Sequence, residues 1–496
     1  MGYIEVAFKR LNFFSKMVNI KIKKIFFWFL VILFALIAPV VVSYAMGYRF
    51  SLERGIFVYS GSITIKPTPR EVEVFVNGKK VSTGMINFLN YSYHIGSLFP
   101  GKYTLEVRSP GYIPWVQEAY VHSGVSTEFW NVFLAREKYT QLEYPTQGVE
   151  NFFISPDGKR IALAEEKEDK TWIKILDIKK EEIIYEFPFD GYKLSKSKKE
   201  NIEWSPREGR LIVPLEKEGK KEYFVINIGT EESYSLNGKI NKEEIQKVRW
   251  SSDDRNTLFY IKEGSLFRSD LENTVNEVEV VKNIVGYDLS GSDIFYLSED
   301  NHIIYKKNIS GRSEAVQITT ESINAVGGEN FELIVYDENR IAVISQDKKL
   351  YLYNQGEESK GVKEVAQGVN GMHFSNDGKK LAFWTNNEIA VYFVRKWETQ
   401  PGRKEGQKVD VVRFAQTIEN VSWFDDYEHL IFSVGKEVKM AELDNRSMKN
   451  IKDLVGLDGE GFKATYNHRE DNLFFIDNKN ENKKLYSISL TEEDEE

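Results

Sequence analysis

Residues 154–162 read ISPDGKRIA, and degraded copies of this phrase recur through the rest of the chain. The serine position and its counterparts are residues 155, 205, 251, 288, 335, 375, 424 and 467. Their spacing averages about 45 residues, the length of four short strands in one blade of a β-propeller. The repeat therefore predicts a mainly β chain with an eight-bladed propeller over residues 139–496, with seven blades as the alternative count.

Each copy predicts two strands joined by a turn. The residue before the serine position is large and apolar in all eight copies, and the residue six positions after it is aliphatic in seven. A polar turn lies between them, in which Pro suits the second position and Gly the fourth. Because one sheet of four strands cannot bury both of its faces, we expect neighbouring copies to stack.

The ends of such a ring must also meet. The last copy stops after its third strand, Leu485–Leu490, whereas earlier copies offer a fourth. An open ring would leave a strand edge exposed to water. We therefore predict that residues 139–144 (YTQLEY) pair with Leu485–Leu490 as the outer strand of the eighth blade.

The repeated phrase resembles the WD40-like repeats of TolB-type propellers, which carry S-P-D-G-K-x-I-A in an inner hairpin. The first and sixth copies match closely, and the second, SPREGRLIV, places its Gly one position later. The resemblance covers about residues 139–496 and implies recognition of peptides or proteins on one rim through variable loops. A propeller hosts both enzymes and scaffolds, so it does not by itself assign a function.

The segment from Ile25 to Tyr48 contains no charged residue. As a helix it would span about 36 Å, more than the roughly 30 Å of a bilayer core. Residues 1–24 carry six basic side chains and one acidic side chain. This asymmetry predicts a cytoplasmic N-terminus, a single membrane-spanning helix over 25–48 in the cell membrane, and extracytoplasmic C-terminal domains. A cleaved signal peptide is the alternative, because Ser43 and Ala45 suit the small-residue cleavage rule.

Residues 49–138 are expected to form a small β-sandwich. Apolar and polar residues alternate over 61–134, and Asn77-Gly78 is a strong hairpin signal, because both residues tolerate positive φ. Alternation along a later strand is expected to bury Tyr103, Leu105 and Val107 on one face.

The stretches PREVEVFVNGKKV, LFPGKYTLEVRSPGYIPW and VHSG together resemble a PEGA domain. Glu71 and Val72 stand where that family has a Gly-Ala pair. PEGA domains are regarded as surface interaction or spacer modules, so the resemblance implies no catalytic residue. The matching residues are Pro69, Val74, Val76, Gly78, Pro100, Gly101, Tyr103, Gly111 and Tyr112.

Composition excludes several kinds of chemistry. The absence of cysteine rules out disulfides, iron–sulfur clusters, Cys-containing zinc sites and thiol nucleophiles. The chain has 66 Lys and Arg against 75 Asp and Glu, which argues against a nucleic-acid partner. Six histidines leave little material for a metal centre. We therefore expect no cofactor and no metal ion, and folding of residues 49–496 that is insensitive to chelators.

Two groups of polar residues invite a catalytic or metal-binding interpretation. Ser195–Lys198 fits S-x-x-K, but it lies in the Lys-rich stretch Lys193–Lys199, which we interpret as a solvated insertion. The pairs Asp253-Asp254 and Asp425-Asp426 fall in the turn of the repeat, where Asp bonds to its own backbone. We interpret them as turn residues, with calcium ligands as the alternative.

Histidines and tryptophans are the remaining candidates. The histidines of the repeat region occupy different repeat positions, so they cannot form one ring at one depth: His302, His373, His429 and His468. Three tryptophans share a single repeat position, which predicts packing between blades rather than a sugar platform: Trp204, Trp250 and Trp423.

The sequence predicts binding rather than catalysis. It has no G-x-S-x-G, no H-E-x-x-H, no P-loop and no Rossmann glycine pattern. We predict a non-catalytic, membrane-anchored surface protein whose propeller binds a protein or peptide partner at one rim or scaffolds an envelope assembly. The alternative is a carbohydrate- or peptide-active enzyme that uses the propeller channel, with acid, base and charge-stabilising residues converging at one end of it. The residues that bind the partner are not assigned by the sequence.

Overall fold

The computed structural model describes residues 2–52, 54–81, 84–87, 91–195, 202–252, 256–271, 277–323 and 331–491. The chain divides into two compact units. Unit 1 comprises Met1–Val107 and Val116–Val132, and unit 2 comprises Arg108–Trp115 and Phe133–Glu496.

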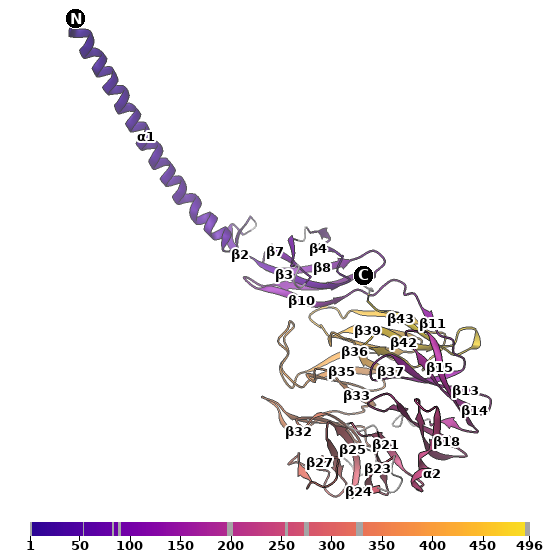
Figure 1. The fold of residues 1–496 in the computed structure, drawn as a ribbon. Coiled ribbons are helices and arrows are strands. Elements are labelled where there is room, and N and C mark those ends of the chain that lie inside the picture. Colours follow the sequence, from indigo (N-terminus) through magenta and orange to yellow (C-terminus); the bar gives the residue numbers. More distant parts are fainter. Residues whose placement is uncertain are drawn as a thin grey trace. The chain divides into compact units, whose positions relative to one another are not determined.

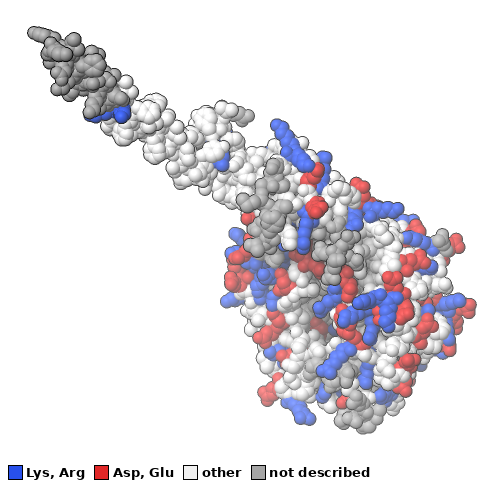
Figure 2. Space-filling view, turned by 45° about the horizontal axis from the view of Figure 1, so that its top comes forward, with Lys and Arg blue, Asp and Glu red and all other residues white. Residues whose placement is uncertain are grey.

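Unit 1 begins with helix α1 (Gly2–Ala45). Its stretch Ile22–Ala45 is 24 residues long and apolar enough to cross a membrane, a criterion that a signal sequence also meets. The side chains of this stretch are almost all exposed, although water solvates such an apolar surface poorly. Figure 2 shows the same surface as a largely uncharged rod beyond its basic end.

The strands of unit 1 form one hairpin and two four-stranded sheets. The hairpin is β1 (Tyr48–Ser51) with β2 (Ile56–Tyr59). One sheet has the order β10-β3-β7-β6 and the other β5-β4-β8-β9 (Figure 1). Their bounds are β3 (Gly61–Thr68), β4 (Glu73–Val76), β5 (Lys79–Lys80), β6 (Gly84–Asn87), β7 (Ser92–Leu98), β8 (Gly101–Arg108), β9 (Trp115–Val121) and β10 (Ser126–Phe133).

The predicted hairpin at Asn77-Gly78 is confirmed. Val76 pairs with Lys79, and the two turn residues have φ of 50° and 74°. On β8, Leu105 and Val107 are fully buried as expected. Tyr103 is only half-buried, because its hydroxyl turns to donate a hydrogen bond to the Phe99 carbonyl at 2.8 Å.

The described residues of unit 2 form eight antiparallel sheets, which we number 1 to 8 along the chain (Figure 1). Sheet 1 contains β12 (Val149–Ile154), β13 (Arg160–Lys167), β14 (Lys170–Asp177) and β15 (Glu182–Asp190), and sheet 2 contains β16 (Lys193–Leu194), β17 (Glu203–Trp204), β18 (Arg210–Lys217), β19 (Lys220–Asn227) and β20 (Glu232–Ser235). Sheet 3 contains β21 (Gln246–Trp250), β22 (Thr257–Lys262), β23 (Ser265–Asp270) and β24 (Glu277–Val281). Sheet 4 contains β25 (Ile284–Ser290), β26 (Asp293–Ser298), β27 (Ile304–Asn308) and β28 (Val316–Gln317).

Sheets 5 to 8 follow the same plan. Sheet 5 contains β29 (Glu332–Asp337), β30 (Arg340–Ile344), β31 (Leu350–Gln355) and β32 (Lys360–Ala366), and sheet 6 contains β33 (Gly371–Phe374), β34 (Lys380–Trp384), β35 (Glu388–Phe393) and β36 (Lys408–Arg413). Sheet 7 contains β37 (Ile418–Trp423), β38 (His429–Val434), β39 (Glu437–Glu442) and β40 (Ile451–Gly456). Sheet 8 contains β41 (Ala464–Asn467), β42 (Asn472–Asp477), β43 (Lys484–Ser489) and β11 (Leu142–Glu143). Helix α2 (Leu236–Ile240) and the 3-10 turn η1 (Lys479–Glu481) are short additions to sheets 2 and 8.

The strand registers correct the repeat alignment in three copies. In sheet 3 the partner of Trp250 is Leu258 and not Thr257, because the turn is one residue longer. In sheet 4 the residue that pairs with Ile294 is Leu289 rather than Tyr287, and in sheet 5 Val335 pairs with Ile341. With these corrections, the second-strand residue that pairs with the end of the first strand is aliphatic in every copy.

Apolar side chains pack between consecutive sheets. In the described residues, seven of eight buried clusters each join two sheets that follow one another in the chain, and the eighth joins the last sheet to the first. One of them joins Phe474 and Leu485 of sheet 8 to Phe152 and Ile161 of sheet 1. The sheets therefore close into a ring, the architecture of a β-propeller.

The predicted closing strand is confirmed. Strand β11 pairs with β43, with Leu142 opposite Ser487 and Glu143 opposite Tyr486. The Tyr144 amide donates to the Leu485 carbonyl at 3.0 Å, which continues the ladder by one bond. The chain before the first repeat thus supplies the outer strand of the last sheet.

Candidate functional site

First strands of neighbouring sheets contact one another, as β17 does with β21, β25 with β29 and β37 with β41. Their registers align one residue on each strand, and alternation places all eight aligned side chains on the same face of their sheets, where Phe153 and Ile334 pack against the clusters between sheets 1 and 2 and between sheets 5 and 6. We call these eight residues the channel ring. They are Phe153, Glu203, Arg249, Asp288, Ile334, His373, Ser422 and Thr465.

The three repeat tryptophans pack between sheets, as predicted, and each donates a hydrogen bond to the backbone of a channel-ring residue. All three side chains are buried. Trp204 Nε1 donates to the Phe153 carbonyl at 2.9 Å, and Trp250 Nε1 donates to the Glu203 carbonyl at 3.1 Å. Trp423 Nε1 donates to the His373 carbonyl at 3.0 Å. Each indole therefore fixes the backbone of the ring residue on the preceding sheet.

Charged ring residues of sheets 2, 3 and 4 form a network of one cation and two carboxylates. Arg249 Nε lies 2.8 Å from a Glu203 carboxylate oxygen, and Arg249 Nη1 lies 3.1 Å from an Asp288 oxygen. The Glu203 carboxylate raises the pKa of the Arg249 guanidinium further, so Arg249 stays charged. The second Asp288 oxygen accepts from the Val335 amide at 2.8 Å. This ion pair links three sheets.

Two basic groups close to the aligned residues have lowered pKa values. Lys463 directly precedes β41 and places its ammonium 3.7 Å from the centre of the Phe153 ring. Loss of solvation there lowers the pKa of Lys463 to about 7. The pKa of His373 is also lowered, first by loss of solvation and then by the neighbouring His468. Lys463 can therefore change charge near neutral pH, whereas the lowered pKa of His373 favours its neutral form.

A recess of about 560 Å³ lies on the rim formed by the turns that follow the first strands, and we call it the mouth recess. Turns of sheets 1, 6, 7 and 8 form it, and the ring residue Thr465 lies in its wall. Its lining residues are Ile154, Ser155, Pro156, Asn376, Asp425, Tyr427, Thr465, Tyr466, Asn467, His468 and Arg469.

Polar groups in the mouth recess are held by one another. His468 Nδ1 lies 2.7 Å from an Asp425 oxygen, and these side chains are 29% and 49% exposed. The Tyr466 hydroxyl donates to Asp471 at 2.5 Å. Burial, reinforced by the Asp471 carboxylate, raises the pKa of Tyr466. The recess thus offers an imidazole–carboxylate pair and the exposed Arg469 in fixed positions.

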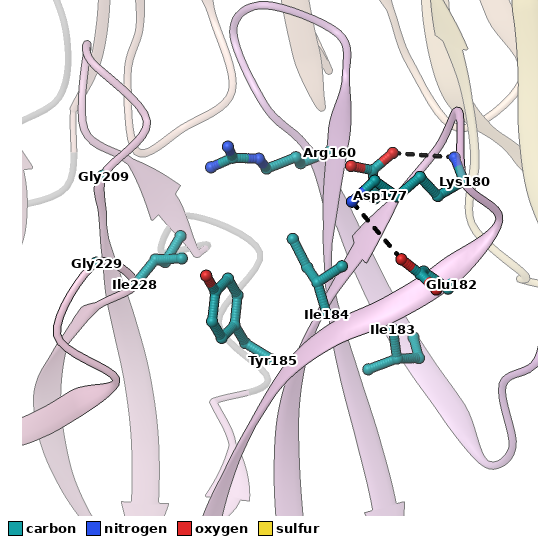
Figure 3. A pocket seen from close by; sticks show the side chains of 10 residues that line it. All are labelled: Arg160, Asp177, Lys180, Glu182, Ile183, Ile184, Tyr185, Gly209, Ile228 and Gly229. Carbon is teal, nitrogen blue, oxygen red and sulfur yellow. Dashed lines mark hydrogen bonds and ion pairs between the residues drawn. The ribbon is translucent and has the colours of Figure 1, made fainter.

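A second recess, of about 610 Å³, lies between sheets 1 and 2 (Figure 3). The Arg160 guanidinium and the Tyr185 ring extend from sheet 1 toward Gly209, Ile228 and Gly229 of sheet 2 in Figure 3. Lys180 is tied to its own turn, because its amide donates to Asp177 at 3.0 Å and its ammonium lies 3.7 Å from Glu182. This recess is lined by residues of only two sheets, whereas the mouth recess is lined by residues of four sheets.

The structure separates the two aspartates of the second acidic pair. Asp426 is a turn residue as interpreted, because it accepts from the amides of Glu428 and His429 at 2.8 and 3.0 Å. Asp425 instead bonds to His468 of the next sheet. Residues 196–201 and 253–255, which include most of the S-x-x-K stretch and the first acidic pair, lie outside the described residues. Among the described residues no group of three or more His, Asp and Glu side chains is placed to hold a metal ion.

The four histidines lie at different positions, as predicted. His373 is on a first strand, His429 begins a second strand, and His468 lies in the turn after β41. His302 lies in the turn between β26 and β27. The charge of His468 nevertheless contributes to lowering the pKa of His373.

Sequence reasoning missed the Arg249 ion pair and Lys463. Glu203 and Arg249 stand directly before Trp204 and Trp250, so the repeat alignment contained their position. The residue preceding the tryptophan was the available signal. Asp288 could not be found in this way, because the alignment of the fourth copy was displaced.

No protein-family model matches the chain. No curated protein matches it. Among solved structures, the "Dos1 propeller" is 13% identical and covers 72% of this chain and 95% of its own, with a TM-score of 0.47. The Myceliophteria thermophila "Cps50 (Swd1) beta-propeller domain" is 12% identical, covering 60% and 98%, with a TM-score of 0.36. An "oligogalacturonate lyase in complex with manganese" is 12% identical, covering 72% and 98%, with a TM-score of 0.37. The propeller architecture of unit 2 therefore follows from its own strand pairings.

Proposed function

We propose that this protein is a membrane-anchored, non-catalytic binding protein whose propeller holds a protein or peptide partner at the mouth recess. The observation that carries the proposal is the composition of that recess. Turns from four sheets converge on it, and turns of this kind vary in sequence while the sheets beneath them stay fixed. A scaffold subunit of an envelope assembly is one form that such binding would take.

The blade count and the first module belong to the same proposal. Eight sheets and eight intersheet clusters in the described residues support an eight-bladed propeller. The two four-stranded sheets of unit 1 support a PEGA-like sandwich that acts as a spacer.

Membrane anchoring places the propeller outside the cytoplasm. The length of Ile22–Ala45 and the basic residues before it support a single span with a cytoplasmic N-terminus. Protease added to spheroplasts should digest the propeller. Protection of the propeller would contradict this orientation, and release of a soluble protein that begins near Met46 would favour a cleaved signal peptide.

Binding is favoured over catalysis by the state of the channel carboxylates. Arg249 engages both Glu203 and Asp288, and Asp288 also accepts a backbone amide. The oxygens of these carboxylates are occupied by partners within the protein, so they are poorly placed to contact a substrate. The Asp425–His468 pair at the mouth has the polarity and partial exposure suited to hydrogen-bond a peptide.

Site-specific crosslinking on native membranes tests the proposal. The photoreactive residue p-benzoylphenylalanine is placed at Arg469 in the mouth recess or at Tyr185 in the recess between sheets 1 and 2. We expect an adduct of defined mass from position 469, and its loss in a chain that also carries Asp425→Ala and His468→Ala. An equal yield from both positions, or an adduct at 469 that survives the double substitution, would contradict a partner at the mouth.

A further inference from the structure

The hairpin β1–β2 presents an exposed aromatic face immediately after the apolar helix. Tyr48 pairs with Tyr59 and Phe50 pairs with Phe57, so all four rings project from the same face. The Tyr48 and Tyr59 rings stack with centroids 5.0 Å apart, and the Phe50 and Phe57 rings meet edge to face at 5.3 Å. Each of these side chains is 37–48% exposed.

The apolar surface continues to the tip of the hairpin. Leu52, at the tip, is 89% exposed, and Ile56, which pairs with Ser51 on the opposite face of the hairpin, is 57% exposed. The hairpin forms a two-stranded sheet of its own. An isolated hairpin of this size is marginal in water, so a water-exposed aromatic ladder would add little to its stability. This surface is better matched to an apolar or interfacial environment than to water.

Local contacts hold the hairpin against the end of the helix. The Arg49 guanidinium donates to the Tyr44 carbonyl at 2.7 Å and lies 3.7 Å from the centre of the Tyr44 ring. The Ser60 amide donates to the Gly47 carbonyl at 3.0 Å. Tyr48 follows Ala45, the last helical residue, by three residues, which span at most about 10 Å. The aromatic face therefore cannot move far from the end of the helix.

We infer that the β1–β2 hairpin lies in the interfacial layer of the bilayer that α1 crosses, with its aromatic face toward the lipid. This inference rests on the proposed membrane anchor. Tyr side chains favour the headgroup layer, because their rings are apolar and their hydroxyls remain hydrated. Phe50, Phe57 and Leu52 would contribute the apolar contact, and the hairpin would act as a collar that restrains the chain leaving the membrane.

The absence of cysteine allows a direct test in the full-length protein. Single cysteines are introduced by Phe50→Cys, Leu52→Cys, Ile37→Cys and Val125→Cys, labelled with an environment-sensitive fluorophore, and reconstituted into phosphatidylcholine–phosphatidylglycerol vesicles. Ile37 reports the centre of the span, and Val125, 53% exposed in the turn between β9 and β10, is the aqueous control outside the hairpin. Quenching by lipids that carry a spin label at shallow or deep positions reports depth.

We expect shallow-label quenching at positions 50 and 52, deep-label quenching at 37, and neither at 125. Quenching at 37 with water-exposed labels at 50 and 52 would overturn the collar while leaving the anchor intact. Loss of quenching at 37 as well would overturn the anchor. Labels at 50 and 52 that are shielded from water without lipid quenching would show that protein, such as a second copy of the chain, covers the face.

A matched substitution separates the aromatic face from mere proximity to the membrane. The combination Tyr48→Ser, Phe57→Ser and Tyr59→Ser should reduce shallow quenching at position 52 at least twofold without changing quenching at position 37. Tyr120→Ser, which removes an aromatic side chain that is 58% exposed elsewhere in unit 1, should change neither. Unchanged quenching at position 52 in the triple variant would contradict a role for the aromatic face.

Discussion

Gly158 combines two roles in the turn of the first repeat. Its φ is +75°, a conformation that L-residues adopt rarely. A Cβ at this position would overlap the side chain of Arg469 and lie 2.8 Å from Asn467 Oδ1. The Asn467 amide in turn donates to the Gly158 carbonyl at 2.9 Å. The glycine of the repeat therefore serves both its own turn and the contact with the preceding sheet.

Gly158→Ala should destabilise unit 2 by about 1–3 kcal/mol, because backbone strain and the clash with sheet 8 add together. Gly219→Ala is the matched control, since Gly219 has φ of +79° and open space around the new methyl group. Thermal unfolding followed by circular dichroism compares the two variants. Equal losses would mean that the packing against Arg469 contributes nothing.

Lys463 should make unit 2 more stable as the pH rises above 7. Its folded pKa of about 7 lies below the unfolded value of about 10.4, so the unfolded chain binds more protons between these values. The free energy of unfolding should increase over that range, and burial of the charge should cost stability below pH 7. Lys463→Met should raise the unfolding midpoint at pH 6.5 and flatten its increase between pH 7 and 10. Lys180→Met, which alters a lysine that is 63% exposed, should do neither.

Residue roles could be predicted where a signal lies within one copy of the repeat. The buried tryptophans share a position that can be read from the sequence, and their packing followed from it. The Arg249 ion pair spans three copies, so it depends on the register of strands about 40 residues apart. Lys463 has a lowered pKa because of its place in the channel, and no property of its neighbours in sequence encodes that place.

Strands β38 and β39 carry a buried titratable network between them. His429 Nδ1 lies 2.6 Å from Asp426 Oδ2. Burial alone would lower the pKa of His429, but the Asp426 carboxylate overrides it and the pKa rises to about 8. Burial raises the pKa of Glu442 to about 7, although Trp115 Nε1 and Asn450 Nδ2 each donate to its carboxylate at 3.0 Å. Lys380, which is fully buried, pairs with Glu428 beside the same turn.

Both groups bind protons more tightly in the folded chain than in the unfolded chain. Their stabilisation is therefore complete below the unfolded pKa values and is lost as the pH rises, between about 4.5 and 7 for Glu442 and between about 6.5 and 8 for His429. Glu442→Gln should flatten the lower part of this decline and raise stability at pH 7, while His429→Gln should abolish the upper part, worth about 2 kcal/mol. Denaturant midpoints measured from pH 4.5 to 8.5 check both. Glu437→Gln, on the exposed side of β39, should leave the profile unchanged, and a wild-type profile that is flat between pH 4.5 and 6.5, where Lys463 is largely charged in both states, would refute the assignment of Glu442.

Strand existence could be predicted more reliably than strand register. Alternation located the third and fourth strands and the closing strand β11, because each needs only a local pattern and an unpaired edge. The fourth copy was displaced by two residues because its first turn is shorter: Leu289 pairs with Ile294, five positions on, whereas Ile154 pairs with Ile161, seven positions on. An alignment that assumes a turn of constant length cannot place such a copy.

At the scale of the whole molecule, each sheet of unit 2 contacts its neighbours, so stability is approximately a sum of intersheet terms. Closure turns seven such interfaces into eight and joins segments about 340 residues apart. If the closing interface is energetically equivalent to the others, no sheet is an end, and unfolding cannot begin by fraying from a terminus.

Two buried leucines test that equivalence. Leu485 lies in the cluster between sheets 8 and 1, and Leu266 lies in the cluster between sheets 3 and 4, and both are fully buried. Leu485→Ala and Leu266→Ala should each cost about 3–5 kcal/mol, because each leaves a cavity of the same kind. Denaturant unfolding gives the cost, and hydrogen exchange shows whether protection falls around the entire ring. Two results would contradict equivalence: a cost below about 1 kcal/mol for Leu485→Ala, or loss of protection confined to sheets 8 and 1. Either would mean that the interface between sheets 8 and 1 lies outside the cooperative unit formed by the other seven interfaces.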